Sequence, residues 1–507
     1  MVVVLVLAAV VFMFAKAPAC AVASAAGDFA RRRNLWIGIT LIIFLAHNFW
    51  IYIVFAGALL LFLQRREPNK IAMYFFLLLA VPAIPDDVPA LGIVNFLFAI
   101  DYVRLLALTV LLPAYLSLRT QPGIERFGRS IPDKLIAGYL ILIPLLMLEN
   151  APFTSTLRQG VFYPFVDIFL PYYVVSRGLK SVQSFRDALM AFLVAALVLS
   201  ATLAFEFALR WLLYGALERA LGAHWGFGQF LLRGENLRAL GTVGHPIIAG
   251  YIVAVAMGFF LYLRKLVPSP KARGLAWLLL AVGLIAPVSR GPWVGAAAML
   301  MVFIATGPAP VRGLAKLGLF GVVALPLLLT TTMGGKIIDH LPWVGTVEEA
   351  NVIGRAHLAE VAMQVILENP FFGRFDVLHH PALEALRGID GIIDLVNTYV
   401  IVGLGRGLVG LSLFVGFFLA VVFSIYRSMW NLADRNDERY VLGQVLIATL
   451  LGTMVVIGTV SPVAASQATY WSLAGLGVAY ARMLATGRAS EAAEASKSRL
   501  ATAKVAT

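Results

Sequence analysis

The chain has 507 residues, of which 61% are hydrophobic and only 13% are charged. A soluble protein of this length needs a larger polar fraction to cover its surface, so the composition excludes a soluble globular protein. The formal net charge of +13 does not indicate a nucleic acid partner. The Lys and Arg residues lie in short segments between apolar runs, as they do in the cytoplasmic loops of membrane proteins.

Apolar segments of the N-terminal half predict a series of membrane-spanning helices. They cover Met1–Phe14, Ile71–Pro85, Tyr102–Leu118, Leu135–Leu148, Val161–Val175 and Ala188–Leu209. The stretch Trp36–Leu63 is too long for one ordinary span and too short for two. We expect His47 and Asn48 inside a helix there, bonded to a neighbouring helix. Glu206 and Arg210 are four residues apart, which predicts an ion pair on one helix.

The C-terminal half predicts further spans on both sides of a long polar loop. They cover Leu240–Leu263, Gly274–Ser289, Trp293–Gly307, Leu314–Thr332, Tyr399–Tyr426, Val441–Val460 and Tyr470–Leu484. The basic segments between spans predict the cytoplasmic loops. They place the loop 334–394 and a tight turn at residues 290–292 on the periplasmic side. A tail rich in Ala, Ser, Glu and Lys follows from Gly487 and is expected in the cytoplasm.

The expected fold is an all-α polytopic membrane protein of about 12–14 transmembrane helices with one large structured periplasmic loop. We divide the chain into N-terminal transmembrane helices over residues 1–237, a membrane core over 238–485 that includes the loop 334–394, and a cytoplasmic tail over 486–507. The single cysteine, Cys20, excludes an intrachain disulfide and a cysteine-based metal site.

Three arginines, Arg238, Arg290 and Arg355, are predicted on the periplasmic side, where positive charge is not needed to orient the chain. Arg290 also lies between two short predicted spans, so we expect its side chain at or below the lipid headgroups. An ionisable side chain there is costly and indicates a functional site. The competing interpretation is that each arginine extends to a phospholipid headgroup. Three arginines on one side of one half of the chain favour a shared anionic ligand.

The loop 334–394 is long for a connection between spans, so we expect it to be structured or functional. It carries much of the acidic content of the chain and the adjacent histidines His379 and His380. The spacing of apolar residues over Ala356–Leu367 predicts an amphipathic helix, which Asn369-Pro370 ends. The sequence has no metal-ligand spacing, nucleotide-binding loop or nucleophile elbow, so we expect neither a metal ion nor a cofactor.

Four segments together resemble the family of O-antigen ligases and Wzy-type O-antigen polymerases. Arg238–Gly250 resembles the family's arginine and proline entry to a span, and Ser289–Trp293 resembles its Ser-Arg-Gly-x-Trp turn. Gly354–Gly373 resembles the arginine and the Asn-Pro-x-x-Gly end of its periplasmic loop. Asn397–Leu411 contains Asn-Thr-Tyr and Gly-Leu-Val-Gly-Leu, which resemble the segment that follows that loop.

The resemblance implies an inner-membrane glycosyltransferase that needs no metal and whose active site faces the periplasm. An acceptor hydroxyl, on the lipid A core or on another glycan, would attack a glycan carried on undecaprenyl pyrophosphate. Arginine suits the leaving pyrophosphate because it stays protonated and binds phosphate oxygens in pairs. Arg290 and Arg355, with Arg238 as a third, are therefore the expected pyrophosphate ligands, and Asn397 and Tyr399 close the loop.

The chain departs from the family pattern at Val396, where the family has a histidine before the asparagine. That histidine is the residue expected to activate the acceptor or to steady the leaving pyrophosphate. Asp394, His380 and Asp390, in that order, are the candidates for the general base. Asp394 has the alternative role of capping the next helix, and His380 that of a solvated loop residue.

The residues do not distinguish a ligase from a polymerase, and the ligase is the preferred hypothesis. A transporter for the same lipid-linked sugar is the alternative from another class of protein. It would have two similar halves with broken helices that meet at mid-membrane. Here the halves differ, and the polar residues gather in one loop. Membrane lipids are further expected partners.

Overall fold

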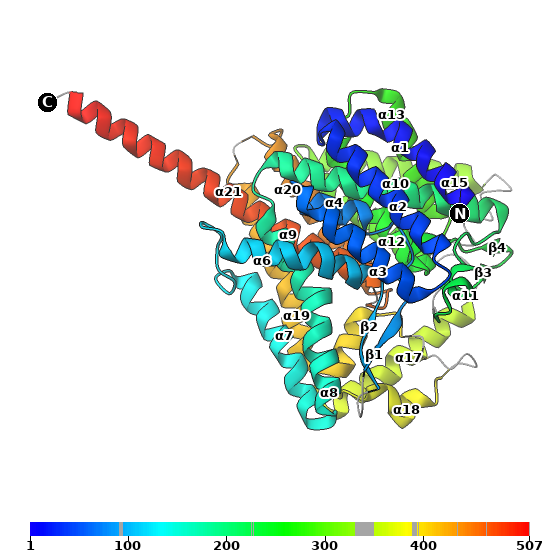
Figure 1. Cartoon of the computed structure of the whole chain (residues 1–507). Helices are drawn as coiled ribbons and strands as arrows, with labels where there is room; N and C mark the ends of the chain where they lie inside the picture. The colour runs from blue at the N-terminus through cyan, green and yellow to red at the C-terminus, as the bar shows by residue number, and fades with distance from the viewer. Residues whose placement is uncertain are drawn as a thin grey trace.

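The computed structural model describes residues 1–90, 95–224, 226, 228–329, 349–387, 393, 395–432, 434–462 and 464–505. Figure 1 shows a bundle of helices from which the C-terminal part of α21 projects. The first half contains α1 (Val2–Val22), α2 (Ala26–Leu45), α3 (Phe49–Leu63), η1 (Gln64–Arg66), α4 (Lys70–Leu77), α5 (Tyr102–Leu106), η2 (Ala107–Leu111), α6 (Leu112–Thr120), α7 (Ile131–Asn150), α8 (Phe153–Ser155), η3 (Thr156–Phe162), η4 (Phe165–Phe169), α9 (Leu170–Gly178) and α10 (Val182–Leu209).

The second half is also helical, and two short hairpins are the only sheets among the described residues. Its helices are α11 (Leu217–Leu221), η5 (Gly241–Val243), α12 (Pro246–Leu263), α13 (Pro270–Ile285), α14 (Arg290–Ala305), α15 (Pro310–Leu329), α17 (Glu349–Glu368), η6 (Val377–His379), α18 (Pro381–Glu384), α19 (Thr398–Trp430), α20 (Glu438–Ile457) and α21 (Ala464–Val505). The hairpins are antiparallel: β1 (Asp86–Pro89) pairs with β2 (Phe96–Ile100), and β3 (Leu232–Arg233) pairs with β4 (Asn236–Leu237).

Eight helices among the described residues are long and apolar enough to cross a membrane. This confirms the all-α polytopic membrane fold that the composition predicts. The helices α10, α12 and α20 are buried over most of their length, as expected for helices that are apolar on every face. The core lies around α12, which packs against α10, α13, α14 and α20. By contrast, α1, α3, α7 and α19 keep many apolar side chains on the outside of the bundle.

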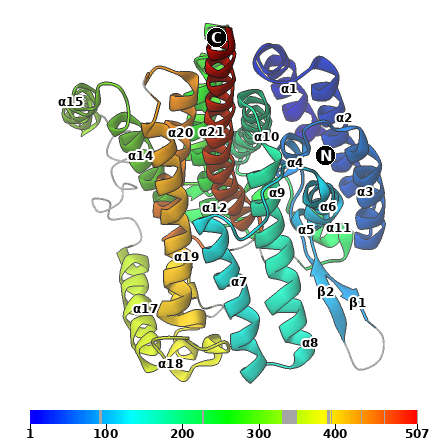
Figure 2. The ribbon, with the colours of Figure 1, turned by 90° about the vertical axis from the view of Figure 1, so that its left-hand side faces the viewer.

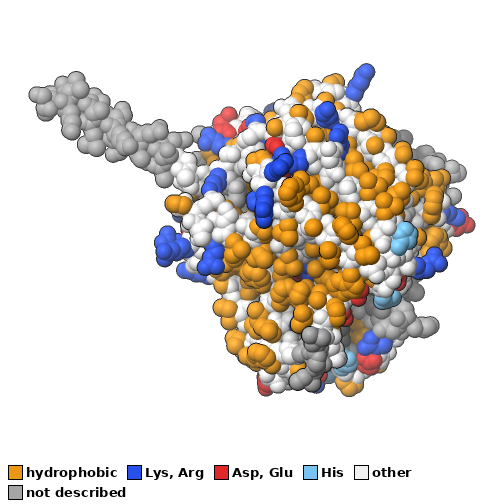
Figure 3. Space-filling model, in the orientation of Figure 1, with side chains coloured by type: hydrophobic (Ala, Val, Ile, Leu, Met, Phe, Trp, Pro, Cys, Tyr) orange, Lys and Arg blue, Asp and Glu red, His pale blue; other side chains and the backbone are white. Residues whose placement is uncertain are grey.

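The outer surface has the apolar character that a lipid environment requires. Figure 3 shows hydrophobic side chains over most of the middle of the visible face, with Lys and Arg side chains mainly in its upper half. Val54 and Phe55 of α3 and Leu145 of α7 are among the large apolar side chains that are exposed. Exposed apolar area of this extent on a monomer marks a membrane or protein contact.

The ambiguous stretch Trp36–Leu63 belongs to two helices, α2 and α3, so the prediction of His47 and Asn48 inside a helix is wrong. The chain breaks between the helices, where His47 has a positive φ of 49°. Asn48 is the N-cap of α3, and its side-chain oxygen accepts hydrogen bonds from the backbone N–H of Trp50 at 2.9 Å and Ile51 at 3.1 Å. Asparagine is a favoured cap because its side chain replaces the missing backbone acceptor.

Two of the helical paths contain π-helical turns. The path from α5 to α6 contains η2, and the path from α8 to α9 contains η3 and η4. Segments of this kind are rare and often lie at functional sites. Asp167, a carboxylate in the otherwise apolar stretch Val161–Val175, lies within η4.

Segments that the sequence places on one side of the membrane lie together at one end of the molecule. In Figure 2, the helices α17 and α18, the β1–β2 hairpin and α8 lie at the end opposite the C-terminus of α21. The predicted amphipathic helix in the polar loop is confirmed as part of α17, which ends at Glu368, directly before Asn369-Pro370. We refer to the end with α17 and α18 as the loop end, and to the opposite end as the tail end.

The tight turn predicted at residues 290–292 is displaced by four residues. Arg290, Gly291 and Pro292 are the first residues of α14, and the chain reverses over residues 286–289. Proline is tolerated in the first turn of a helix because the N–H that it lacks has no partner within the helix there. Pro292 therefore lies in the first turn of a helix, where the sequence-based prediction placed a loop.

Candidate functional site

The turn over residues 286–289 is the point at which two of the predicted arginines meet. Arg238 donates from Nη2 to the Ser289 hydroxyl at 3.0 Å and from Nε to the Pro287 carbonyl at 3.4 Å. Arg290 follows Ser289 directly as the first residue of α14. Val288 within this turn has a positive φ of 47°. A β-branched residue in that region is strained, and such strain is characteristic of functional sites.

A third arginine, Arg233, holds the same turn and was not among the residues that the sequence singled out. Its Nη1 donates to the carbonyl of Val288 at 2.6 Å, and the side chain is buried. Arg233 comes from the β3–β4 hairpin, and the N–H of Ala239 just beyond donates to the carbonyl of Ala286 at 3.2 Å. The signal in the sequence is a second arginine five residues before Arg238. We call Arg233, Arg238 and Arg290 the arginine turn.

Glu206 fixes the segment that carries Arg238, so the predicted ion pair with Arg210 is wrong. The buried carboxylate of Glu206 accepts three backbone N–H bonds, from Leu213 at 3.0 Å, Leu240 at 2.9 Å and Gly241 at 2.8 Å. Arg210 instead ends α10 with a positive φ and donates to the backbone carbonyl of Glu235. The spacing of four residues does not bring the two side chains together because the helix ends between them.

The loop over residues 458–463, between α20 and α21, joins the arginine turn to the Asn-Thr-Tyr segment. A side chain at Gly291 would collide with Thr459, so α14 starts directly against this loop. The Thr398 hydroxyl donates to the carbonyl of Val460 at 2.6 Å, and the Ser461 hydroxyl donates to the carbonyl of Leu395 at 3.0 Å. Two segments that resemble the family, about 100 residues apart in sequence, therefore meet at one loop.

Asn397 and Tyr399 begin α19 and anchor it. The Asn397 side chain caps the helix by accepting bonds from the N–H of Tyr399 at 3.0 Å and of Val400 at 3.3 Å. The Tyr399 hydroxyl donates to the carbonyl of Met454 in α20 at 2.7 Å. The cap of α19 is thus Asn397, whereas Asp394 was the residue considered for that role.

The Asn-Pro-Phe-Phe-Gly segment is built into a break in α19. At Gly407 the helix is interrupted by a φ of 60° and a ψ of −165°. The N–H of Arg374 donates to the carbonyl of Leu404 at 2.8 Å, and the N–H of Leu408 donates to that of Pro370 at 2.7 Å. A side chain at Gly407 would collide with the backbone of Phe371. The break therefore explains why the two motifs carry glycine: each approaches the backbone of the other.

Of the candidate bases, His380 is described, and its two ring nitrogens are both engaged. His380 caps α18 by accepting a bond at Nδ1 from the N–H of Ala382 at 3.3 Å, and Nε2 lies 3.0 Å from a carboxylate oxygen of Glu368. This arrangement favours a structural role in joining α17 to α18. Asp390 and Asp394 lie outside the described residues. Arg355 lies in α17, and its side chain is also outside the described part.

A cavity of about 410 Å³ lies near the start of α12. It is lined by Tyr74, Leu78, Val81, Ala83, Pro85, Asp101, Val103, Arg104, Ala107, Val166, Asp167, Pro171, Gly226, Thr242, Val243, Ile248, Pro462, Ala465, Gln467 and Ala468. Thr242, Val243 and Ile248 come from the segment that follows Arg238, and Pro462 comes from the loop 458–463. The cavity and the arginine turn therefore share two structural elements.

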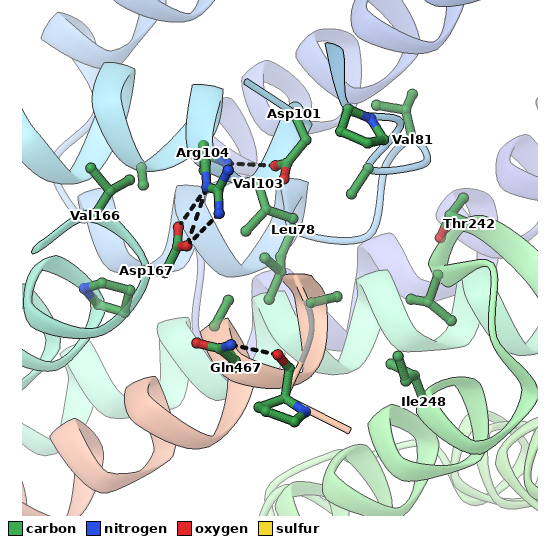
Figure 4. A pocket seen from close by; sticks show the side chains of 18 of the residues that line it. Leu78, Val81, Asp101, Val103, Arg104, Val166, Asp167, Thr242, Ile248 and Gln467 are labelled. Carbon is green, nitrogen blue, oxygen red and sulfur yellow. Dashed lines mark hydrogen bonds and ion pairs between the residues drawn. The ribbon is translucent and has the colours of Figure 1, made fainter. Parts of the chain in front are cut away.

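Charged residues of the first half supply one wall of the cavity (Figure 4). Arg104 donates to Asp167 from Nη2 at 2.8 Å and to the carbonyl of Ala99 at 2.7 Å, and its guanidinium lies 3.8 Å from the ring centroid of Tyr163. Asp101 caps α5 by accepting the N–H of Arg104 at 2.9 Å. Opposite them, Gln467 donates to the carbonyl of Pro462 at 2.6 Å.

Asp101 directly precedes the candidate span Tyr102–Thr120 and is buried at 8% exposure. Burial raises the pKa of its carboxyl to about 6, although Arg104 opposes this shift. Asp101, Arg104 and Asp167 were not singled out from the sequence. The available signals were Asp-x-x-Arg at the start of one apolar stretch and a lone aspartate inside another, since ionisable residues within spans are functional candidates by default.

Among the described side chains, no group of three or more His, Cys, Asp or Glu residues could hold a metal ion. The chain matches no protein-family model and no curated protein. Any assignment of function therefore depends on the four segments and on the way the fold arranges them.

Proposed function

We propose that the protein is a glycosyltransferase of the O-antigen ligase type, in the bacterial inner membrane with its site facing the periplasm. It would move a glycan from undecaprenyl pyrophosphate to an acceptor hydroxyl of the lipid A core. The observation that carries this proposal is the meeting of segments that resemble the family. Arg238 contacts Ser289, Gly291 packs on the loop 458–463, and Thr398 bonds to the same loop.

The arginine turn supplies the charge that this reaction needs. The acceptor oxygen forms a bond to the anomeric carbon, and the bond from that carbon to the pyrophosphate breaks with its electron pair on the leaving group. Positioned guanidinium groups stabilise the negative charge that develops there, and one such donor contributes about 3 kcal/mol. Arg290 and Arg238 bind the pyrophosphate in this proposal, Arg355 joins them from α17, and Arg233 holds the turn in place.

The proton of the acceptor hydroxyl passes to a general base, which contributes about 10²–10⁴-fold. Asp394 is the first residue to test, because it directly precedes Leu395, whose carbonyl is bonded to Ser461 of the loop 458–463. Asp390 is the second. His380 is the third, because its ring nitrogens are engaged within α17 and α18.

The test is deletion of the gene and complementation with wild type, Arg238→Ala, Arg290→Ala or Arg355→Ala. Arg219→Ala serves as the matched control, because Arg219 is an exposed arginine of α11 that precedes the same segment. The readouts are gels of lipopolysaccharide, the pool of lipid-linked glycans, and the amount of protein in the membrane. In the deletion strain we expect long glycans that stay on the lipid carrier. Wild type and the control should restore their transfer, and Arg290→Ala should not.

Other outcomes would redirect the assignment. Single repeats without long chains would indicate a polymerase of the same architecture. Stranded glycans on the cytoplasmic face would indicate a transporter. Full rescue by the arginine variants at normal protein levels would overturn the pyrophosphate-binding role of the arginine turn.

A further inference from the structure

The cavity near the start of α12 is lined by more carboxylate than guanidinium groups. Its charged side chains are the carboxylates of Asp101 and Asp167 and the guanidinium of Arg104. Arg104 is paired with Asp167 at 2.8 Å, so the carboxylate of Asp101 gives the wall a net negative charge. A cavity of this charge disfavours a phosphate or pyrophosphate group. Its ligand is therefore a different part of the substrate from the one that arginine binds.

The groups on the wall are those that bind hydroxyls. The Asp101 carboxylate accepts the N–H of Arg104, and an ionised carboxylate has about four acceptor positions, so it retains the capacity to accept from a ligand hydroxyl. Gln467 supplies an amide, and leucine, valine and proline side chains supply apolar surface. The volume of about 410 Å³ falls within the usual range for small-molecule sites, roughly 300–1,000 Å³. A few polar groups on an apolar wall suit the hydroxyls and C–H faces of a sugar.

The cavity and the arginine turn lie on different sides of α12. Ile248 lines the cavity, whereas Gly250 of the same helix faces Pro292 at the start of α14. Residues two apart on a helix point in nearly opposite directions, since each residue turns the helix by about 100°. A sugar in the cavity and a pyrophosphate at the turn would therefore have to meet across the N-terminal end of this helix.

We propose that this cavity is the binding site for the sugar of the acceptor and that Asp101 accepts hydrogen bonds from its hydroxyls. The inference rests on the proposed glycosyl transfer, because that reaction supplies the two substrates. It adds residues of the first half of the chain, Asp101, Arg104 and Asp167, to a site for which the family resemblance points only to segments between residues 238 and 411. It also identifies the substrate class that the cavity selects: a neutral or amino sugar, in preference to a phosphorylated one.

The experiment measures binding, not transfer. The purified full chain in lipid nanodiscs is titrated with the core oligosaccharide released from the lipopolysaccharide of the source bacterium, followed by calorimetry. Asp101→Asn removes the charge but keeps a good helix cap, because asparagine caps as well as aspartate does. Ala83→Leu places a larger side chain on the cavity wall. Asp86→Asn, a carboxylate of β1 that does not line the cavity, is the matched control.

We expect saturable binding to wild type and to the control. Asp101→Asn should weaken it by at least about tenfold, the loss of one charge-assisted hydrogen bond, and Ala83→Leu should abolish it. Absence of binding to wild type would overturn the cavity assignment. Binding by Asp101→Asn and Ala83→Leu that is as strong as the binding by wild type would overturn it too. Competition is a further test. The assignment would also be overturned if the released donor glycan displaced the bound oligosaccharide and a second acceptor sugar did not. A different result would separate the two proposals. If the purified protein binds the sugar but deletion of the gene leaves lipopolysaccharide unchanged, the proposed transfer is rejected and the sugar site is kept.

Discussion

Two groups of buried or partly buried arginines are held in different ways. Arg32 pairs with Glu67 at 2.6 Å and with Asp187 at 2.7 Å, and Arg177 pairs with Asp133 at 2.8 Å. These ion pairs join segments that are far apart in sequence. Arg233 and Arg238 donate to carbonyl groups and to a hydroxyl of the turn 286–289. These bonds hold one turn of the backbone in place.

The comparison teaches that position alone does not reveal the role of a charge in a membrane protein. A buried guanidinium that is paired with carboxylates connects helices, and its loss leaves those carboxylates without compensation. A guanidinium that donates to the carbonyl groups of a turn acts through the backbone that it positions. We therefore expect variants of Arg32 to lower stability most, and variants of the arginine turn to lower the proposed transfer most.

The largest expected effect is at Arg32, whose side chain is 1% exposed. Arg32→Ala leaves Glu67 and Asp187 buried without their partner, which destabilises the protein by about 3–5 kcal/mol. We expect a strong loss of folded protein in the membrane and a lower melting temperature in detergent. The exposed Arg427 of α19 is the control, and Arg427→Ala should behave as wild type. A normal melting temperature for Arg32→Ala would contradict the structural role of the network.

The second prediction concerns the contact between Gly291 and Thr459. Gly291→Ala places a methyl group against the Thr459 side chain, and overpacking of this kind costs about 1–3 kcal/mol. We expect reduced transfer and a lower melting temperature. Thr459→Gly in the same chain should restore both, because it removes the colliding atoms. If Gly291→Ala is as stable and active as wild type on its own, the arginine turn does not pack on the loop 458–463 as described.

Arg233 provides a third and smaller test. Arg233→Ala removes the bond to the Val288 carbonyl, and a hydrogen bond from a charged group contributes about 1.5–3 kcal/mol. Because Arg233 acts through the turn, we expect the KM for the lipid-linked donor to rise by about tenfold or more, with a smaller change in KM for the acceptor. Arg219→Ala is again the control. An unchanged donor KM together with a reduced melting temperature would assign Arg233 a purely structural role.

Much of the fold could be predicted from the sequence, because long apolar stretches and the basic segments between them are local signals. The end of α17 before Asn369-Pro370 was predicted for the same reason. Helix breaks were harder: His47 and the turn 286–289 depend on backbone angles that several residue types can adopt. The break at Gly407 depends on packing against Phe371, which is 36 residues away in the chain.

The candidate site was predicted only in part. Arg238 and Arg290 could be singled out because a positive charge on that side of the membrane is unusual, and the fold brings them to one turn. Arg233 and the cavity residues Asp101, Arg104 and Asp167 were missed, because their proximity follows from the packing of the first half of the chain against α12 and α21. Spacing within the sequence carries no information on that packing.

The smallest expected effect is a pH dependence of acceptor binding. The pKa of Asp101 is raised by burial to about 6, and its ionised form is the one that accepts hydrogen bonds from hydroxyls. Binding should therefore be strongest well above pH 6, where the carboxyl is ionised, and should weaken as the pH falls through this value. The other titratable groups near Asp101 are Arg104, Asp167, Tyr52, Tyr74 and Tyr102. Asp101→Asn has no proton to gain at this position, so its weaker binding should not change over the same range. Calorimetric titration at pH 5, 6, 7 and 8 would measure the affinity for the acceptor sugar at each pH. Parallel pH profiles for wild type and Asp101→Asn would show that Asp101 does not contact the sugar.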